Sequence, residues 1–188
     1  QPLAYPMFIE PNDWTNDRKG GYLLNEVMRG HHLVRQGEVG IVQGELPLRF
    51  LNKIQKVGYK INPFTYGIAQ ELLQRGIAVG KFIPIVEIPM PNKPLDIDTN
   101  KESRKSYCRD AAEAKNKQAL VYQASCRTRK QMEAARLFID RERFFVPWNY
   151  DWRGRCYPIP SYLSVQDTDF GKSLLNFADA AVVTEESK

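Results

Sequence analysis

The residues best suited to chemistry lie close together between Asn149 and Pro158. This stretch combines two basic residues, one carboxylate, one glycine and three aromatic residues, namely Arg153, Arg155, Asp151, Gly154, Tyr150, Trp152 and Tyr157. Pro147 and Pro158 bracket it, which disfavours a continuous helix and predicts an extended segment. Side chains alternate between the faces of an extended segment, so both arginines would leave one face, about 6–7 Å apart at the backbone. Two guanidinium groups at that spacing suit neighbouring phosphates of a polynucleotide.

The residue types leave two interpretations of this stretch open. In the first, Asp151 holds one arginine in a fixed fork, Gly154 lets a ligand approach the backbone, and the arginines bind phosphates. In the second, an ion pair lies at a strand edge with Trp152 packed beneath it. The chemistry of the side chains does not choose between them.

The segment Tyr150–Tyr157 closely resembles the Asp-Trp-Arg-Gly-Arg motif of single-subunit, bacteriophage-type DNA-dependent RNA polymerases, where the motif opens the palm after the thumb. The resemblance continues in order along nearly the whole chain. Four further groups of residues carry it: Trp14-Thr15 with Gly20-Gly21-Tyr22, Glu87–Met90 with Asp96-Ile97-Asp98, Pro147-Trp148-Asn149, and Gly171–Leu175. The resemblance favours the nucleic-acid interpretation.

The resemblance implies a mixed, mainly α fold: a helical thumb plus the beginning of the α/β palm of a right-hand polymerase. Residues 1–90 would be the end of an N-terminal domain, residues 91–145 thumb-like basic helices, and residues 146–188 the start of the palm. In such enzymes Arg153 and Arg155 would lie near the template and the RNA–DNA hybrid, with Trp152 supporting them by packing. The basic residues of the thumb do not align one for one with the family.

The resemblance also implies an activity for the complete chain. A DNA-directed RNA polymerase, a nucleotidyltransferase, transcribes a DNA template into RNA from ribonucleoside triphosphates and uses Mg²⁺. The family's metal-binding aspartates lie downstream of this segment, so we expect no catalytic and no metal-binding residue here, and no activity from this segment alone. The expected partners are the DNA template, the RNA transcript and ribonucleoside triphosphates, without a membrane or an obligatory protein subunit. The expected compartment is the cytoplasm of an infected host cell or, alternatively, an organelle matrix.

Composition agrees with an intracellular, soluble protein. The chain has 188 residues, of which 43% are hydrophobic and 26% charged. Its three cysteines, at positions 108, 126 and 156, follow no disulfide or metal-binding spacing, which is typical of a reducing compartment. Proline and glycine interrupt the apolar runs before any could span a membrane. Neither Gln1 nor Lys188 carries a terminal signal, so we expect an internal fragment.

Local signals predict the elements around the motif. One helix should run from Pro47 to about Val57, and a second, capped by Asn62 and stopped by Gly76, should run to about Arg75. A short helix capped by Thr168 should carry Leu174, Leu175, Phe177 and Ala178.

Residues 101–143 form a long helical pattern without proline or glycine, in one helix or two. Twelve lysines and arginines stand against six acids there, a net of +6 in a chain whose total is +5, so the positive charge is concentrated on this element. The predicted apolar arc contains Leu120, Val121, Ala124, Ala135, Phe138 and Ile139. The opposite arc contains Lys101, Arg104, Lys105, Lys115, Arg129, Lys130, Arg136 and Arg143.

We predict that Lys115, Arg129, Lys130 and Arg136 contact the phosphate backbone without reading sequence. A solvated helix face is the plainer interpretation. Two other hypotheses for the chain stay open: a stand-alone, non-enzymatic nucleic-acid-binding module, and a helical domain that binds an acidic protein.

Asp96 and Asp98 are the one pair of carboxylates that suggests a metal site. They precede Thr99–Glu102, a capping-box pattern, and a helix N-terminus stabilises negative charge. The sequence therefore favours a role at the start of a helix over a metal site.

Overall fold

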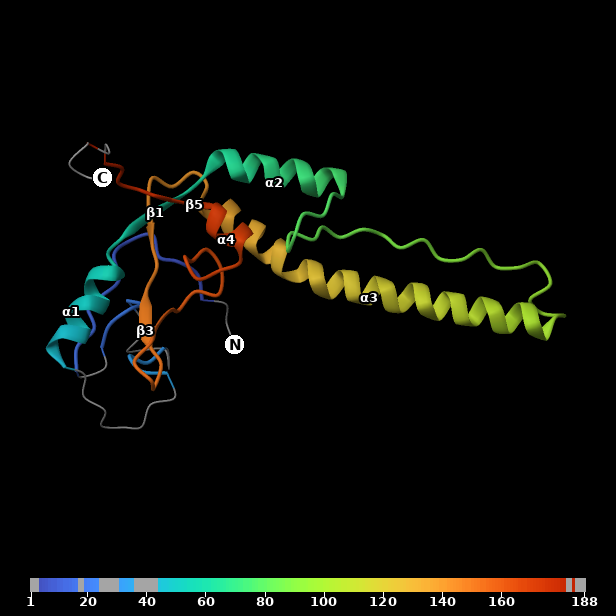
Figure 1. Ribbon diagram of the computed structural model, residues 1–188, viewed down its shortest axis with the longest axis horizontal. Coiled ribbons are helices and arrows are strands. Elements are labelled where there is room, and N and C mark those ends of the chain that lie inside the picture. Colours follow the sequence, from blue (N-terminus) through green and yellow to red (C-terminus); the bar gives the residue numbers. More distant parts are fainter. Residues whose placement is uncertain (1–3, 17–18, 24–30, 36–43, 182–183, 185–188) are drawn as a thin grey trace. The chain divides into compact units, whose positions relative to one another are not determined.

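The computed structural model describes residues 4–16, 19–23, 31–35, 44–181 and 184 (Figure 1). Its elements in order are α1 (Glu45–Ile54), β1 (Gly58–Ile61), α2 (Pro63–Arg75), α3 (Lys101–Phe138), β2 (Phe144–Phe145), β3 (Trp148–Tyr150), β4 (Cys156–Pro158), α4 (Asp169–Ser173) and β5 (Leu175–Phe177). The fold is thus a mixture of helices and small antiparallel sheets, as expected at this coarse level. None of the helices in the described ranges is both long and apolar enough to cross a membrane.

The chain divides into two compact units. The first consists of Gln1–Tyr66 and Gln131–Lys188, and the second of Gly67–Lys130. Helices α2 and α3 each begin in one unit and end in the other.

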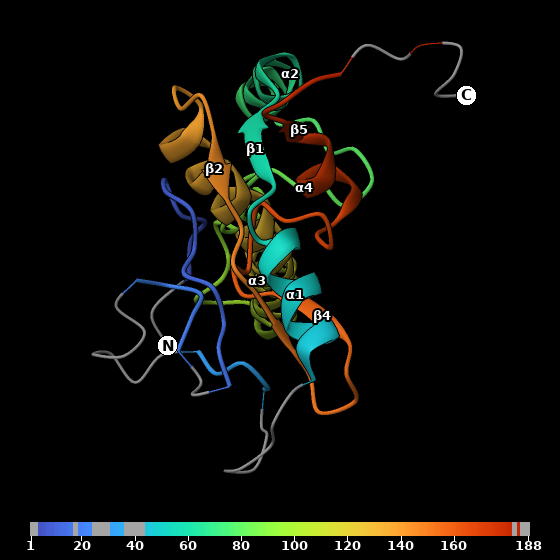
Figure 2. The ribbon, with the colours of Figure 1, turned by 90° about the vertical axis from the view of Figure 1, so that its left-hand side faces the viewer.

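Two small sheets organise the first unit. In the larger one β1 lies between β2 and β5, with both neighbours antiparallel (Figure 2). In the smaller one β3 pairs with β4, and Asn149 lies opposite Tyr157. Aromatic residues dominate the strands, as expected of segments that pack on a pleated surface. The ring of Phe144 on β2 lies 4.9 Å from that of Phe138, and both side chains are almost fully buried.

Local signals set the ends of α2 as predicted. The side chain of Asn62 accepts hydrogen bonds from the backbone N–H groups of Phe64 and Thr65, at 3.1 and 3.3 Å. Pro63 occupies the first helical position, where its missing N–H costs nothing. Gly76 ends the helix with a φ of 67°, a conformation that disfavours other residues.

The short helix near the C-terminus was predicted only in part. Thr168 does cap α4, accepting a hydrogen bond from the N–H of Gly171. The expectation that the helix continues through Leu175 and Phe177 is wrong, because these residues form β5. Pairing with β1 satisfies their backbone groups, and a partner so distant in sequence leaves no local signal.

The long pattern after residue 101 forms one helix, α3, which ends at Phe138. Within the second unit the proline-rich segment before it is hydrogen-bonded to α3 at two places. Thr128 accepts from the N–H of Ile83 at 3.0 Å, and Gln118 accepts from the N–H of Ile88 at 2.7 Å. Side-chain hydrogen bonds therefore secure a segment whose prolines cannot form a regular ladder.

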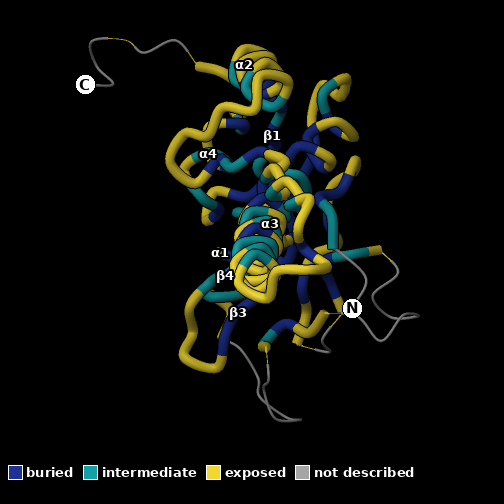
Figure 3. The backbone as a smooth tube through the Cα atoms, turned by 90° about the vertical axis from the view of Figure 1, so that its right-hand side faces the viewer, coloured by how far each residue is buried: buried dark blue, intermediate teal, exposed yellow. Residues whose placement is uncertain are grey.

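The predicted apolar arc of α3 needs correction. Ala135 and Phe138 are buried, but Leu120 is 66% exposed and Ala124 is also exposed. Polar residues are buried in their place, namely Ser125, Thr128 and Gln131. Each of these three side chains is hydrogen-bonded, which removes the free-energy cost of burying it. A hydropathy pattern cannot detect such hydrogen bonds. In Figure 3, which views α3 nearly end-on, the turns nearest the viewer carry exposed and half-buried residues.

Candidate nucleic-acid interface

The stretch Asn149–Pro158 forms a β-hairpin, so the expectation of one extended segment is wrong. Strands β3 and β4 pair, and residues 151–155 turn between them. The carboxylate of Asp151 closes this turn, because its Oδ1 accepts the backbone N–H groups of Arg153 and Arg155, both at 2.9 Å. Gly154 has a φ of 79°, which favours glycine at this position. The predicted alternation of side chains between two faces therefore does not apply.

Asp151 also holds the guanidinium of Arg153. Oδ2 of Asp151 lies 3.1 Å from Nε and 3.0 Å from Nη2, a two-pronged contact. Burial alone would raise the pKa of the Asp151 carboxyl, but hydrogen bonds from the Arg155 N–H and from Arg153 hold the pKa below its usual value. The prediction that Asp151 fixes one arginine is confirmed, and the arginine is Arg153.

Trp152 does not lie beneath the ion pair. Its side chain is 68% exposed, and the guanidinium of Arg153 lies 5.4 Å from the centre of its ring. The expected packing by Trp152 is thus limited to this cation–π contact, on the outside of the turn. The exposed indole and the guanidinium of Arg153 thus lie side by side at the turn.

The Arg155 side chain differs from that of Arg153 in having no fixed partner among the residues that the structure describes. Asp151 uses the backbone N–H of Arg155, whereas the exposed guanidinium forms no hydrogen bond or ion pair with any residue in the described ranges. Its donors are therefore available to a ligand.

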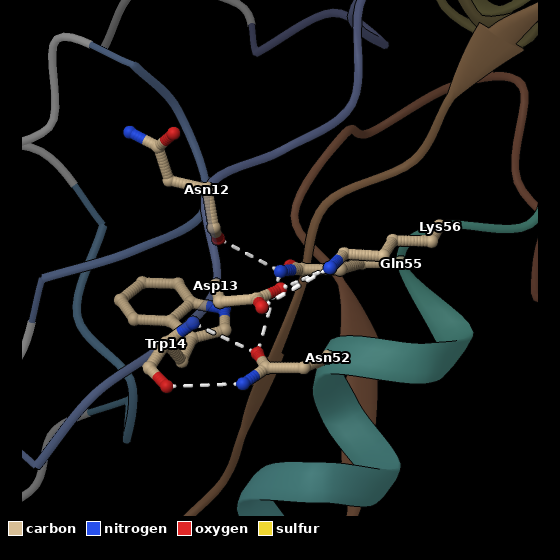
Figure 4. Close-up of polar contacts among 6 residues, drawn as sticks. All are labelled: Asn12, Asp13, Trp14, Asn52, Gln55 and Lys56. Atoms are coloured by element: carbon tan, nitrogen blue, oxygen red, sulfur yellow. Dashed lines mark hydrogen bonds and ion pairs between the residues drawn. The ribbon is translucent and has the colours of Figure 1, made fainter.

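A loop early in the chain contacts the hairpin from the side of β3. Trp14 is buried and donates from its indole Nε1 to the carbonyl of Trp148 at 2.8 Å. Asn52 on α1 exchanges two hydrogen bonds with the backbone of Trp14, and Gln55 donates to the carbonyl of Asn12 (Figure 4). The Trp14–Tyr22 segment is therefore a structured loop in its described part.

Sequence reasoning missed Arg35, whose side chain contacts both strands of the hairpin. No motif surrounds Arg35 in the sequence, and its partners lie more than a hundred residues later. Only the folded chain identifies it.

The candidate residues on α3 differ in their surroundings. Lys115 and Arg136 are exposed, and Lys130 is half-buried. Arg129 is also half-buried, with its guanidinium 4.7 Å from the ring centre of Tyr122. Arg143 lies beyond the end of α3, where Asp179 binds it at 3.1 Å. The predicted basic arc therefore ends before Arg143, because α3 ends at Phe138.

Asp96 lies at the start of α3, as predicted. Its carboxylate accepts hydrogen bonds from Ser103 at 2.7 Å and Asn100 at 3.1 Å, and Asn100 caps the helix in place of the predicted Thr99. The hydrogen bond from Ser103 lowers the pKa of the Asp96 carboxyl. In the described part of the chain no three histidine, cysteine or acidic side chains come together as metal ligands would.

No family model matches the chain. Individual proteins do match it. The chain is 28% identical over 181 residues to DNA-directed RNA polymerase 2, chloroplastic/mitochondrial, of Arabidopsis thaliana, a match that covers 93% of this chain. It is also 28% identical over 199 residues to T7 RNA polymerase of Escherichia phage T7, across 98% of this chain. These matches confirm the resemblance to single-subunit RNA polymerases.

The chain spans only a small part of these polymerases. It covers 18% of the Arabidopsis protein, 22% of the phage T7 protein and 13% of the mitochondrial DNA-directed RNA polymerase of Neurospora crassa. The similarity to RNA polymerases therefore concerns one segment, which contains the hairpin and α3.

Proposed function

We propose that the chain is part of a single-subunit DNA-directed RNA polymerase that transcribes a DNA template into RNA from ribonucleoside triphosphates. One observation carries this proposal: more than nine-tenths of the chain matches RNA polymerases from phages and from organelles. The compartment depends on whether the polymerase is of the phage or of the organellar kind. A phage enzyme acts in the cytoplasm of an infected host cell, and an organellar enzyme acts in the organelle matrix.

Within such an enzyme, the turn at residues 151–155 contacts the template and the RNA–DNA hybrid. Asp151 fixes the guanidinium of Arg153, which then meets a phosphate without a further loss of side-chain freedom. Arg155, whose guanidinium has no partner among the described residues, supplies a fork of donors for a second phosphate or a sugar. Exposed Trp152 adds a surface for stacking. Contacts of this kind position nucleic acid and read no sequence, which suits an enzyme that moves along its template.

The domain assignment is part of the same proposal. Residues 1–90 belong to the end of an N-terminal domain, residues 91–145 to a thumb and residues 146–188 to the start of a palm. The long helix α3, with exposed Lys115 and Arg136, supports a thumb that lies against a phosphate backbone.

Mg²⁺ is the metal that the resemblance implies, and the residues described here do not fit it. The carboxylate of Asp96 is hydrogen-bonded at the start of a helix, and that of Asp151 is occupied by Arg153 and by backbone N–H groups. We therefore derive no catalytic step from this segment. Its residues hold nucleic acid, and the rest of the polypeptide supplies the metal ligands.

Primer extension tests the proposal. The full-length polypeptide, given a DNA template, an RNA primer, the four ribonucleoside triphosphates and Mg²⁺, should extend the primer as the template directs. The 188-residue chain alone should give no product. Failure of the full-length polypeptide to extend the primer would contradict the polymerase assignment, and extension by the chain alone would show that the catalytic centre lies within it.

A further inference from the structure

Arg35 joins the two strands of the hairpin through its side chain. Nε donates to Oδ1 of Asn149 on β3 at 2.7 Å, and Nη2 donates to the carbonyl of Pro158 on β4 at 2.7 Å. The guanidinium also lies 5.1 Å from the ring centre of Tyr157. One planar group therefore contacts three residues of the hairpin.

The backbone around Arg35 adds a further edge to the same hairpin. The N–H of Arg35 donates to the carbonyl of Tyr150 at 2.7 Å, and the N–H of Tyr150 donates to the carbonyl of Leu33 at 2.8 Å. Val34 thereby forms a parallel bridge with Tyr150. Asn149 completes the connection by donating from its amide to the carbonyl of His32 at 3.2 Å.

The contacts of Arg35 lie where they can stabilise the pairing of β3 with β4. Strands β3 and β4 have three residues each, and a short two-stranded ribbon is marginally stable by itself. Asn149 lies directly opposite Tyr157, one pair away from the last pair before the turn. A group that bonds both strands there restricts their twist and register, and so restricts the direction in which the turn presents Arg155.

We propose that Arg35 is a positioning residue that fixes the β3–β4 hairpin and thereby directs Arg155 toward the nucleic-acid backbone. Arginine is needed because two acceptors on different strands are bonded at once, which the single ammonium of lysine cannot do in the same plane. The inference rests on the proposed function, since it assigns Arg35 a role in the same nucleic-acid site.

Hydrogen exchange tests the structural half without any ligand. In the full chain with Arg35→Lys, the amides of Asp151 and Ile159, which bond across the hairpin, should exchange faster than in the wild type. The amides of β1 should exchange as in the wild type, which shows that the unit is folded. Arg35→Gln serves as a second variant with the same expectation. Unchanged exchange at Asp151 and Ile159 in both variants would overturn the proposal.

A double-mutant cycle tests the functional half. Binding of a labelled RNA–DNA hybrid is measured by fluorescence anisotropy for Arg35→Lys, Arg155→Lys and the double variant, with exposed Arg49→Lys as the matched control. We expect Arg35→Lys to weaken binding about tenfold, the effect of losing one charge-assisted hydrogen bond. In the Arg155→Lys background the same change should cost less than about twofold, because Arg35 acts through Arg155.

Two results of the cycle would overturn the inference. Equal losses in both backgrounds would show that Arg35 does not act through Arg155. The second result is that Arg35→Lys binds the hybrid with wild-type affinity, while in Arg35→Gln the slope of log affinity against log salt concentration is flatter by about 0.7–0.9. Arg35 would then be a direct phosphate contact. If the wild-type chain binds no hybrid, the proposed function fails, and hydrogen exchange alone then decides whether Arg35 holds the hairpin.

Discussion

The carboxylate of Asp151 has two tasks within one turn. One oxygen accepts the backbone N–H groups of Arg153 and Arg155, and the other binds the guanidinium of Arg153. The two arginines are therefore unequal, since the guanidinium of Arg153 is fixed by Asp151 and that of Arg155 has no partner in the described part of the chain. The local pattern contained a signal for this turn, because aspartate followed three residues later by glycine favours a β-turn. Pro147 and Pro158, which bracket the motif, instead favoured the prediction of an extended segment.

Replacing Asp151 by asparagine should reduce stability at neutral pH and flatten its decline in acid. The folded-state pKa of Asp151 lies below its usual value, so the ionised carboxylate stabilises the fold above the unfolded-state pKa of about 3.9. That contribution is lost as the pH falls through the folded-state pKa. Melting temperatures at pH 7 and pH 3 measure it, with exposed Asp98→Asn as the control. The same acid-induced decline in wild type and Asp151→Asn would contradict this role.

At the scale of elements, some boundaries are set by local sequence signals, and others depend on contacts between residues that are distant in the sequence. Asn62, Pro63 and Gly76 could be identified from the sequence because each acts on the backbone next to it. The strand β5 could not, because its backbone is satisfied by β1. The buried face of α3 could not either, since Thr128 is acceptable there only through its bond to a distant N–H.

Thr128→Val should destabilise the second unit by about 1–3 kcal/mol, the cost of leaving a polar group without its partner. Valine has nearly the same shape, but it cannot accept the hydrogen bond from the N–H of Ile83, and Thr128 is fully buried. Chemical denaturation of this variant and of a control variant measures the change in the free energy of unfolding. Exposed Ser106→Ala on the same helix should stay within about 0.5 kcal/mol of wild type. Equal effects of the two substitutions would show that the proline-rich segment is not held by Thr128.

The basic residues of α3 offer a matched pair. Lys115 is exposed, and no ion pair joins it to another side chain in the described ranges, whereas Glu113 binds Lys117 at 2.6 Å. If α3 contacts a phosphate backbone through its unpaired cations, Lys115→Ala should flatten the salt dependence of hybrid binding by about 0.7–0.9. Lys117→Ala should change it less. Identical slopes for the wild type and both variants would mean that this part of α3 is a solvated face.

At the scale of the whole molecule, the proposed function combines the similarity to RNA polymerases with the geometry of the hairpin. The similarity covers nearly all of the chain, and the hairpin contains the motif for which we propose nucleic-acid contacts. Residue types could suggest phosphate binding, but they could not separate Arg153, which Asp151 fixes, from Arg155, whose guanidinium has no partner in the described ranges. That distinction depends on which backbone groups meet the Asp151 carboxylate, and so on the folded turn.

Run-off transcription by the full-length polypeptide tests the central claim most directly. Arg155→Lys keeps the positive charge but loses the fork that grips a phosphate or sugar. We predict an unchanged melting temperature and elongation slowed about tenfold or more, the effect of one lost charge-assisted hydrogen bond. The control Arg49→Lys, an exposed arginine on α1, should elongate like the wild type. Elongation by Arg155→Lys at the wild-type rate would contradict the account.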